Sequence, residues 1–131
     1  MRTFEIDADE DVPTVTGLVK GPDRAKRVSL VFDTGCEVTQ FHIPILEAIG
    51  YSAANATAIA SMAGVSGPTQ QGYRLKLGHL RVLGIDFKNV EVAAFDFENF
   101  VERGMEGLLG YDIIRTLNLK LDGPKRLLTV Y

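Results

Sequence analysis

Cysteine and histidine are scarce in this chain, whose 131 residues include one cysteine and two histidines. The single cysteine, Cys36, excludes an internal disulfide and with it a small fold held together by disulfides. His42, His79 and Cys36 are scattered along the chain and show no spacing typical of a zinc site or a cysteine protease. The sequence therefore predicts no metal site and no cofactor.

An excess of positive charge and long apolar runs are also missing. The 14 Lys and Arg residues against 17 Asp and Glu give a formal net charge of −3, so the chain lacks the basic surface typical of nucleic-acid binders. No run approaches the ~18 apolar residues of a membrane helix, and Met1 to Glu5 lack the apolar stretch of a secretory signal. With the single cysteine, these absences predict a cytoplasmic protein that binds neither nucleic acid nor membranes.

The composition and the spacing of turn residues predict a mostly β fold. Apolar residues make up 46% of the chain and charged residues 24%, and the length fits one domain spanning residues 1–131. Two short helices are predicted over 41–50, where Pro44 fits the first turn and Gly50 the end, and over 110–117. The remaining predicted elements are strands and hairpins separated by glycine, proline and asparagine, over 12–32, 53–67, 73–77, 80–82, 87–95, 119–122 and 127–131.

The strongest local signal is LVFDTG at residues 30–35, an apolar strand that ends in a carboxylate, a hydroxyl and a glycine. Burial of the Asp33 carboxylate costs free energy unless donors converge on it, and Thr34 and Gly35 can supply a hydroxyl and closely approaching backbone amides. Taken alone, this tripeptide also fits a solvated turn, because Asp and Gly are common turn residues. A second motif, GLLGYD at residues 107–112, follows the sheet-rich middle of the chain.

These two motifs, in this order, resemble the retropepsin-like aspartic peptidases, the single-domain family that includes the retroviral proteases. In that family an apolar segment and Asp-Thr-Gly begin the active-site loop, and an apolar pair followed by glycine precedes the C-terminal helix. The resemblance covers Pro13 to Tyr131 and is greatest to bacterial and retroelement-like members, whose second motif is Leu-Gly-x-Asp. It implies a single-domain acid protease fold, a closed barrel-like sheet with two short helices, and a two-fold homodimer.

The resemblance also implies roles for residues of the first motif. Asp33 would be the catalytic carboxylate, Thr34 would form hydrogen bonds across the dimer, and Gly35 would let the loop backbone approach the substrate. Glu37 would contact the peptide backbone, and the hydroxyl of Thr39 would lie at the end of the loop. Gly110 matches the glycine of the second motif.

A flap that closes over bound substrate is implied for the glycine-tipped hairpin. The candidate substrate-binding residues there are Ile59, Met62, Ala63, Gly64 and Val65. Apolar side chains at these positions favour apolar substrate side chains beside the cleaved bond, with ordinary core packing as the alternative interpretation. Gly64 and Gly67 would permit the flap to open and close.

The chain departs from the retroviral pattern at two positions. Cys36 replaces the usual alanine, and it is interpreted either as a small core residue or as a redox-sensitive thiol beside the catalytic carboxylates. Tyr111 stands where retroviral members have an arginine that braces the active-site loop. The loop is therefore expected to be braced differently in this chain.

A single Asp-Thr-Gly predicts that two copies of the chain build one active site. Peptide hydrolysis by an aspartic peptidase needs one ionised carboxylate to take a proton from water and one protonated carboxylate to polarise the scissile carbonyl. The only other Asp-Gly, at Asp122, lies in a late turn without the apolar strand and the hydroxyl. The second carboxylate must then come from the Asp33 of another copy, on a two-fold axis. The terminal strand, 127–131, and the N-terminal segment are candidates for an intersubunit sheet.

The predicted function is that of an aspartic endopeptidase, a hydrolase that cleaves peptides or proteins with water activated between two Asp33 carboxylates. A non-catalytic peptide-binding or dimerisation module that keeps the same fold is the alternative, because a fold alone does not establish an activity. The departures at Cys36 and Tyr111 favour this alternative. The intact Asp-Thr-Gly favours the enzyme.

Overall fold

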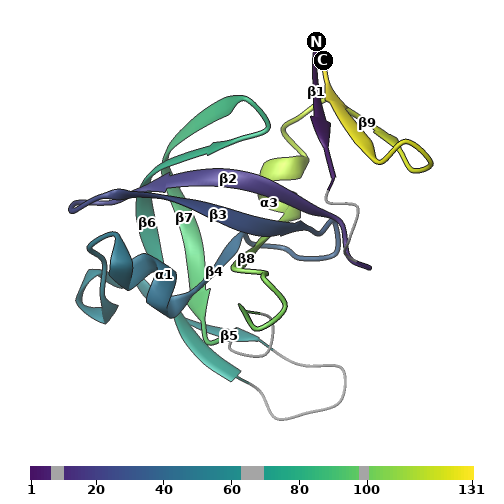
Figure 1. Cartoon of the computed structure of the whole chain (residues 1–131). Helices are drawn as coiled ribbons and strands as arrows, with labels where there is room; N and C mark the ends of the chain where they lie inside the picture. Colours follow the sequence, from purple (N-terminus) through teal and green to yellow (C-terminus); the bar gives the residue numbers. More distant parts are fainter. Residues whose placement is uncertain (7–10, 63–69, 98–100) are drawn as a thin grey trace.

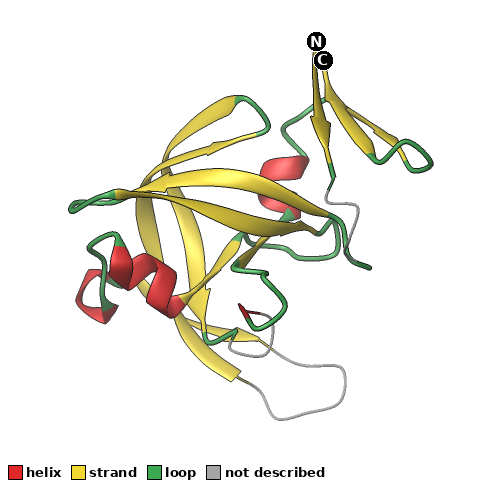
Figure 2. Cartoon of the chain, viewed as in Figure 1, coloured by secondary structure: helices red, strands yellow, loops and turns green. Residues whose placement is uncertain are grey.

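Short strands separated by tight turns make up most of the computed structural model, which describes residues 1–6, 11–62, 70–97 and 101–131. Figure 2 shows how few helical turns interrupt the sheet. The strands described are β1 (Arg2–Glu5), β2 (Thr14–Lys20), β3 (Ala25–Phe32), β4 (Gln40–His42), β5 (Ala58–Met62), β6 (Gln70–Val82), β7 (Ile85–Phe95), β8 (Gly107–Leu109), β9 (Leu119–Asp122) and β10 (Leu127–Val130). The helical segments are α1 (Ile43–Ala48), a 3-10 turn (Ala53–Asn55) and α3 (Tyr111–Ile114).

Six strands close into a barrel in the order β2-β3-β8-β4-β7-β6, because β2 also pairs with β6. Strand β5 extends the sheet beyond β6 as an antiparallel neighbour, which confirms the hairpin expected from the sequence up to the residues that the structure describes. Two pairs are parallel, β3 with β8 and β4 with β7. Figure 1 shows β8 and β4 near the centre of the molecule. The two motifs of the sequence come together there through the pairing of β8 with β3, from Leu30 opposite Gly107 to Phe32 opposite Leu109.

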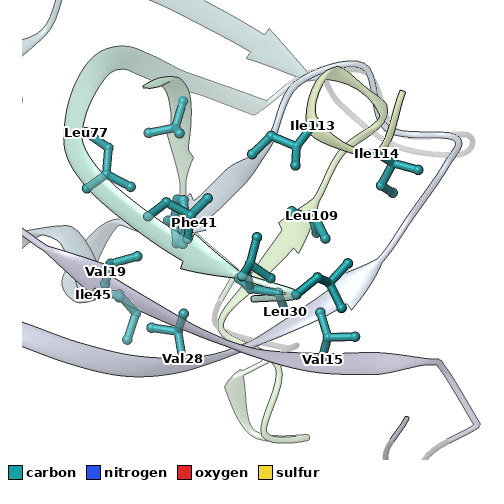
Figure 3. Close-up of a cluster of buried hydrophobic side chains, with 14 of the residues drawn as sticks. Val15, Val19, Val28, Leu30, Phe41, Ile45, Leu77, Leu109, Ile113 and Ile114 are labelled. Carbon is teal, nitrogen blue, oxygen red and sulfur yellow. The ribbon is translucent and has the colours of Figure 1, made fainter. Parts of the chain in front are cut away.

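The barrel is filled by alternate apolar side chains from its strands (Figure 3). Val19, Leu30, Phe41, Leu77 and Leu109 are completely buried there, and each comes from a different strand. Since successive side chains of a strand point to opposite faces, the neighbouring residues face outward, where a groove or the solvent can reach them. The closed, mostly β fold predicted from the sequence is confirmed.

Helix α1 covers one side of the barrel with Leu46, which is fully buried. Its first turn contains Pro44, whose missing N–H needs no partner there, and Gly50 follows its end with a φ of 109°. The helix expected over 41–50 is therefore confirmed. Helix α3 confirms the one expected over 110–117, although it occupies only the first part of that range.

Strand β6 is continuous, whereas the sequence predicted a break or a bulge at Gly78. The pairing of β6 with β7 keeps the same register on both sides of Gly78, from Tyr73 opposite Ala94 to Val82 opposite Ile85. The Gly78 N–H donates to the Tyr51 hydroxyl at 2.8 Å instead of to the neighbouring strand. A side chain therefore supplies the partner that the ladder lacks, and the strand does not end.

The two ends of the chain lie side by side in a second, smaller sheet (Figure 1). Strand β10 lies in its middle, with β1 antiparallel on one edge and β9 antiparallel on the other. Both edges of β10 are thus used within one chain. Both terminal segments were candidates for an intersubunit sheet. Within one chain they pair with each other, and β1 and β9 form the edges of this sheet.

Candidate active site

Asp33 lies directly after β3, at the point where this strand runs beside β8. Its backbone N–H donates to the Leu109 carbonyl at 3.0 Å, which continues the pairing of Phe32 with Leu109 by one residue. The chain then turns sharply, because the Cys36 N–H donates to the Asp33 carbonyl at 3.3 Å. The Gly35 N–H donates to Asp33 Oδ1 at 2.9 Å. The carboxylate is therefore oriented by the loop that it begins, and it is only partly buried.

The far end of the same loop is held by Asp112 in helix α3. The Asp112 carboxylate accepts hydrogen bonds from the Thr39 N–H at 3.1 Å and from the Thr39 hydroxyl at 2.8 Å. The Thr39 oxygen accepts in turn from the Gly110 N–H at 3.0 Å, and the Cys36 carbonyl accepts from the Tyr111 N–H at 2.7 Å. The first motif and the second motif are thus joined by side-chain and backbone hydrogen bonds.

Gly110 is the position where the loop and the helix approach most closely. A Cβ atom at Gly110 would lie 2.8 Å from the Thr39 nitrogen, 2.9 Å from Asp112 Oδ1 and 2.9 Å from the Cys36 carbonyl oxygen. These distances are shorter than a carbon atom tolerates against nitrogen and oxygen atoms, and two of the three atoms belong to the backbone. The glycine of the second motif is therefore required by packing, since its φ of −88° is open to any residue.

A groove of about 530 Å³ runs past the Asp33 carboxylate. It is bounded by the loop at residues 33–39, by the outward faces of β4, β7 and β8, and by the β5–β6 hairpin. Its lining is mixed, with carboxylate, guanidinium and amide groups among apolar side chains. The lining residues are Asp33, Gly35, Cys36, Glu37, Val38, Gln40, Ala60, Ser61, Met62, Arg74, Ala93, Phe95 and Leu108.

A family model described as aspartyl protease matches residues 15–113, which is more than half of the chain and includes both motifs. The chain belongs to the aspartyl protease family. No curated protein matches it in sequence at a significant level. The range matched by the family model contains both Asp33 and Gly110, which lie in the two motifs.

Solved structures share the fold of this aspartyl protease family member at low sequence identity. A retropepsin-like aspartic protease from Rickettsia conorii matches with a TM-score of 0.71 and 15% identity, over 98% of this chain and 88% of that one. The retroviral protease-like domain of Ddi1 from Leishmania major matches with a TM-score of 0.63 and 13% identity, over 93% and 90% of the two chains. The EIAV protease in complex with the inhibitor HBY-793 matches with a TM-score of 0.55 and 15% identity, over 84% and 91%.

Four of the site residues expected for the aspartyl protease lie together in the groove, namely Asp33, Gly35, Glu37 and Met62. Thr34 is exposed beside Asp33 and does not line the groove in the single chain. The expected residues Ala63, Gly64 and Val65 lie outside the residues that the structure describes.

Ile59 does not line the groove, although its apolar side chain made it a candidate. It is 81% exposed, while the next residue, Ala60, is buried and faces the groove. The pairing of Ile59 with Tyr73 and of Ala60 with Gly72 fixes this alternation along β5. A shift by one residue would exchange the two faces, and the sequence of this hairpin does not reveal which one faces inward.

Gln40 and Arg74 line the groove but were not among the residues expected from the sequence. Each is a single polar residue within a strand. In a sequence, such a residue looks the same as one that simply faces the solvent. Their common location becomes visible only through the pairing of β4, β7 and β6. No short sequence motif could have identified them.

Cys36 lines the groove instead of filling the core, and its side chain is half-buried. Its thiol donates to the Val38 carbonyl at 3.1 Å. Burial raises the pKa of the Cys36 thiol, and the negative charges of Asp33, Asp112 and Glu37 raise it further. The thiol form is therefore favoured beside the candidate catalytic carboxylate.

The described part of the chain contains no group of three or more His, Cys, Asp or Glu side chains arranged to hold a metal ion. Among the same residues, no helix has the length and the apolar character needed to cross a membrane. The cytoplasmic location expected from the sequence stays a prediction.

Proposed function

We propose that this chain is an aspartic endopeptidase that acts as a homodimer with one Asp33 from each subunit. The observation that carries this proposal is the position of the Asp33 carboxylate. It lies at the end of a barrel strand, is oriented by the Gly35 N–H at 2.9 Å and lines a groove large enough for several side chains of a peptide. Membership of the aspartyl protease family supports the same activity.

The proposed chemistry needs two carboxylates that differ in protonation. Two Asp33 side chains about 3 Å apart cannot both ionise at low cost, so the pair shares one proton over a mildly acidic to neutral range. The ionised partner takes a proton from a water molecule, which then attacks the scissile carbonyl. The protonated partner donates to the carbonyl oxygen, which gives a tetrahedral intermediate. This intermediate collapses when the first Asp33 passes the proton taken from water to the departing amine and the second Asp33 takes back a hydroxyl proton from the intermediate.

The second carboxylate is proposed to come from a partner subunit. Thr34 is exposed next to Asp33, so its hydroxyl is accessible to a second chain that is related to the first by a two-fold axis. The peptide substrate would bind in an extended conformation, with its alternate side chains entering the groove between the active-site loop and the β5–β6 hairpin. Glu37 and Met62, at two sides of this groove, are proposed to contact it.

Comparison of the purified protein with its Asp33→Asn variant tests this proposal. Both are incubated with a mixture of denatured proteins from about pH 4 to pH 7, the range in which a carboxylate pair shares a proton, and the products are sequenced. Cleavage by the unmodified protein and its loss in the variant are expected. Equal cleavage by both proteins, or none by either, would contradict the endopeptidase and favour the non-catalytic peptide-binding module.

A further inference from the structure

A row of three side chains crosses the floor of the groove on neighbouring strands. Gln40 of β4 is the register partner of Ala93 of β7, and Ala93 is the register partner of Arg74 of β6. Direct partners in a sheet point to the same face, and all three residues line the groove. Ala93 contributes only a methyl group, so the two polar side chains of this row, Gln40 and Arg74, border the groove from the strands on either side of β7.

The Gln40 side chain has an unsatisfied hydrogen-bonding group. Gln40 is 9% exposed, and its Oε1 atom is fully buried without a hydrogen-bond partner among the described residues. Buried amide groups in folded proteins are nearly always paired, because an unpaired one has lost its hydrogen bonds to water. A group that enters the groove above Ala93 can supply the missing partner after a rotation of the amide.

The Arg74 guanidinium retains donors for a ligand. Its Nη1 atom lies 3.5 Å from Glu91 Oε1, and the two side chains are 41% and 47% exposed. Ion pairs as exposed as this one are weak, and a guanidinium carries five N–H donors. The Arg74 end of this row therefore offers N–H donors to a group that also reaches the amide of Gln40.

We propose that Gln40 and Arg74 form a subsite that selects a substrate side chain ending in a primary amide, Gln or Asn. This subsite rests on the proposed peptidase function. A primary amide pairs with the Gln40 amide through one donor and one acceptor in either orientation of that amide, and its carbonyl also accepts from Arg74. A carboxylate has no donor to offer and would add negative charge to a groove that already contains Asp33 and Glu37.

An apolar substrate side chain at this place would leave Gln40 unpaired. Sites built to form hydrogen bonds with a substrate group discriminate strongly against analogues that lack it, because buried polar groups are then left without partners. The subsite is therefore expected to distinguish Gln from Met, which has a similar length and shape. The rest of the groove, with Ala60, Met62 and Phe95, stays open to apolar side chains.

The test compares the cleavage products of four proteins on one mixture of denatured proteins. These are the unmodified protein, Gln40→Leu, Arg74→Met and the control Arg24→Met, whose exposed arginine lies in the β2–β3 turn outside the groove. The unmodified protein and the control are expected to show Gln and Asn enriched about fivefold or more at one position near the cleaved bond. Gln40→Leu and Arg74→Met are expected to lose that enrichment.

A pair of peptides that differ only by Gln or Met at this position gives the second measurement. The expected kcat/KM of the unmodified protein is about tenfold higher for the Gln peptide, and each groove variant reduces this ratio toward one. Cleavage without amide enrichment, or enrichment that survives in both groove variants, would overturn the subsite and leave the peptidase intact. Absence of any Asp33-dependent cleavage would overturn the proposed function and the subsite with it.

Discussion

At the scale of single residues, Asp112 is the side chain that fixes the loop carrying Asp33. Its carboxylate accepts from both the N–H and the hydroxyl of Thr39, and from the Ile113 N–H at 2.9 Å. Hydrogen bonds to a charged acceptor are stronger than neutral ones, and this group is partly shielded from water. Asp112 thus braces the loop. A different brace was expected from the sequence, because Tyr111 stands where retroviral members have an arginine.

Asp112→Ala is expected to lower the free energy of unfolding by about 2–3 kcal/mol, because it leaves the Thr39 donors without their acceptor. Urea unfolding at a fixed protein concentration measures the loss. The matched control is Asp122→Ala, since Asp122 accepts one exposed hydrogen bond, from the Lys125 N–H at 3.0 Å. A loss of about 0.5 kcal/mol or less is expected for the control, and equal losses in the two variants would contradict the bracing role of Asp112.

Cys36 is expected to make the protein less stable at alkaline pH. Burial, reinforced by the neighbouring carboxylates, raises the thiol pKa above its ordinary value of 9.0, so the folded chain holds this proton more tightly than the unfolded chain. The stabilisation is therefore fully present below the unfolded pKa and is lost as the pH rises through the folded pKa. Urea unfolding at about pH 7 and pH 10 should show the stability of the unmodified protein falling relative to Cys36→Ala. A constant difference between the two proteins would contradict this pKa shift.

The same shift bears on the redox hypothesis for Cys36. Oxidants react with the thiolate, and a raised pKa lowers the thiolate fraction at neutral pH. The raised pKa therefore favours a thiol that reacts slowly beside the carboxylates. Alkylation of the folded protein should be slower than that of the urea-unfolded chain, in which the thiol is fully solvated and away from Asp33.

At the scale of elements, the junction between β8 and α3 depends on the absence of a side chain at Gly110. The loop atoms of Cys36 and Thr39 lie against the Gly110 Cα, which allows the backbone hydrogen bonds between loop and helix to form. The position of Asp33 is therefore coupled to the start of α3 through backbone contacts. A substitution at Gly110 acts on the loop without touching the groove.

Gly110→Ala is expected to destabilise the protein by about 1–3 kcal/mol, the usual cost of forcing an extra methyl into a closely packed place. Gly123→Ala is the matched control, because a Cβ at Gly123 meets no atom within 4 Å. Thermal unfolding compares the two variants under identical conditions. If Gly110→Ala were as stable as Gly123→Ala, the loop and the helix would not be packed as closely as the structure shows.

The elements also show which parts of the fold could be predicted from the sequence. The positions of β2, β3 and the two helices follow from local patterns, because alternation, proline and glycine act over a few residues. The groove could not be predicted from these local patterns, because its lining depends on how strands far apart in the sequence pair with one another. Ile59 is apolar and faces outward, whereas Gln40 and Arg74 are polar and line the groove on either side of Ala93.

At the scale of the whole molecule, one chain provides half of the proposed catalytic pair. Among the described residues, Asp33 is the one aspartate that lines the groove, where its carboxylate accepts from the Gly35 N–H. The small terminal sheet has β10 paired on both sides, so a second subunit can add strands only at its β1 and β9 edges. Association and activity are therefore expected to be linked, and activity per chain should fall on dilution.

Mixing the unmodified protein with the Asp33→Asn variant tests whether two chains share one active site. With a fourfold excess of the variant and free exchange of subunits, about one fifth of the unmodified chains pair with one another, so activity per unmodified chain should fall to about one fifth. Serum albumin at the same concentration is the control and should leave activity unchanged. When the variant is added immediately before the assay, inhibition should develop only as the subunits exchange. Competition for substrate would inhibit at once, so the time course distinguishes the two causes. Activity proportional to the unmodified chains at every ratio would show that a single chain carries a complete site.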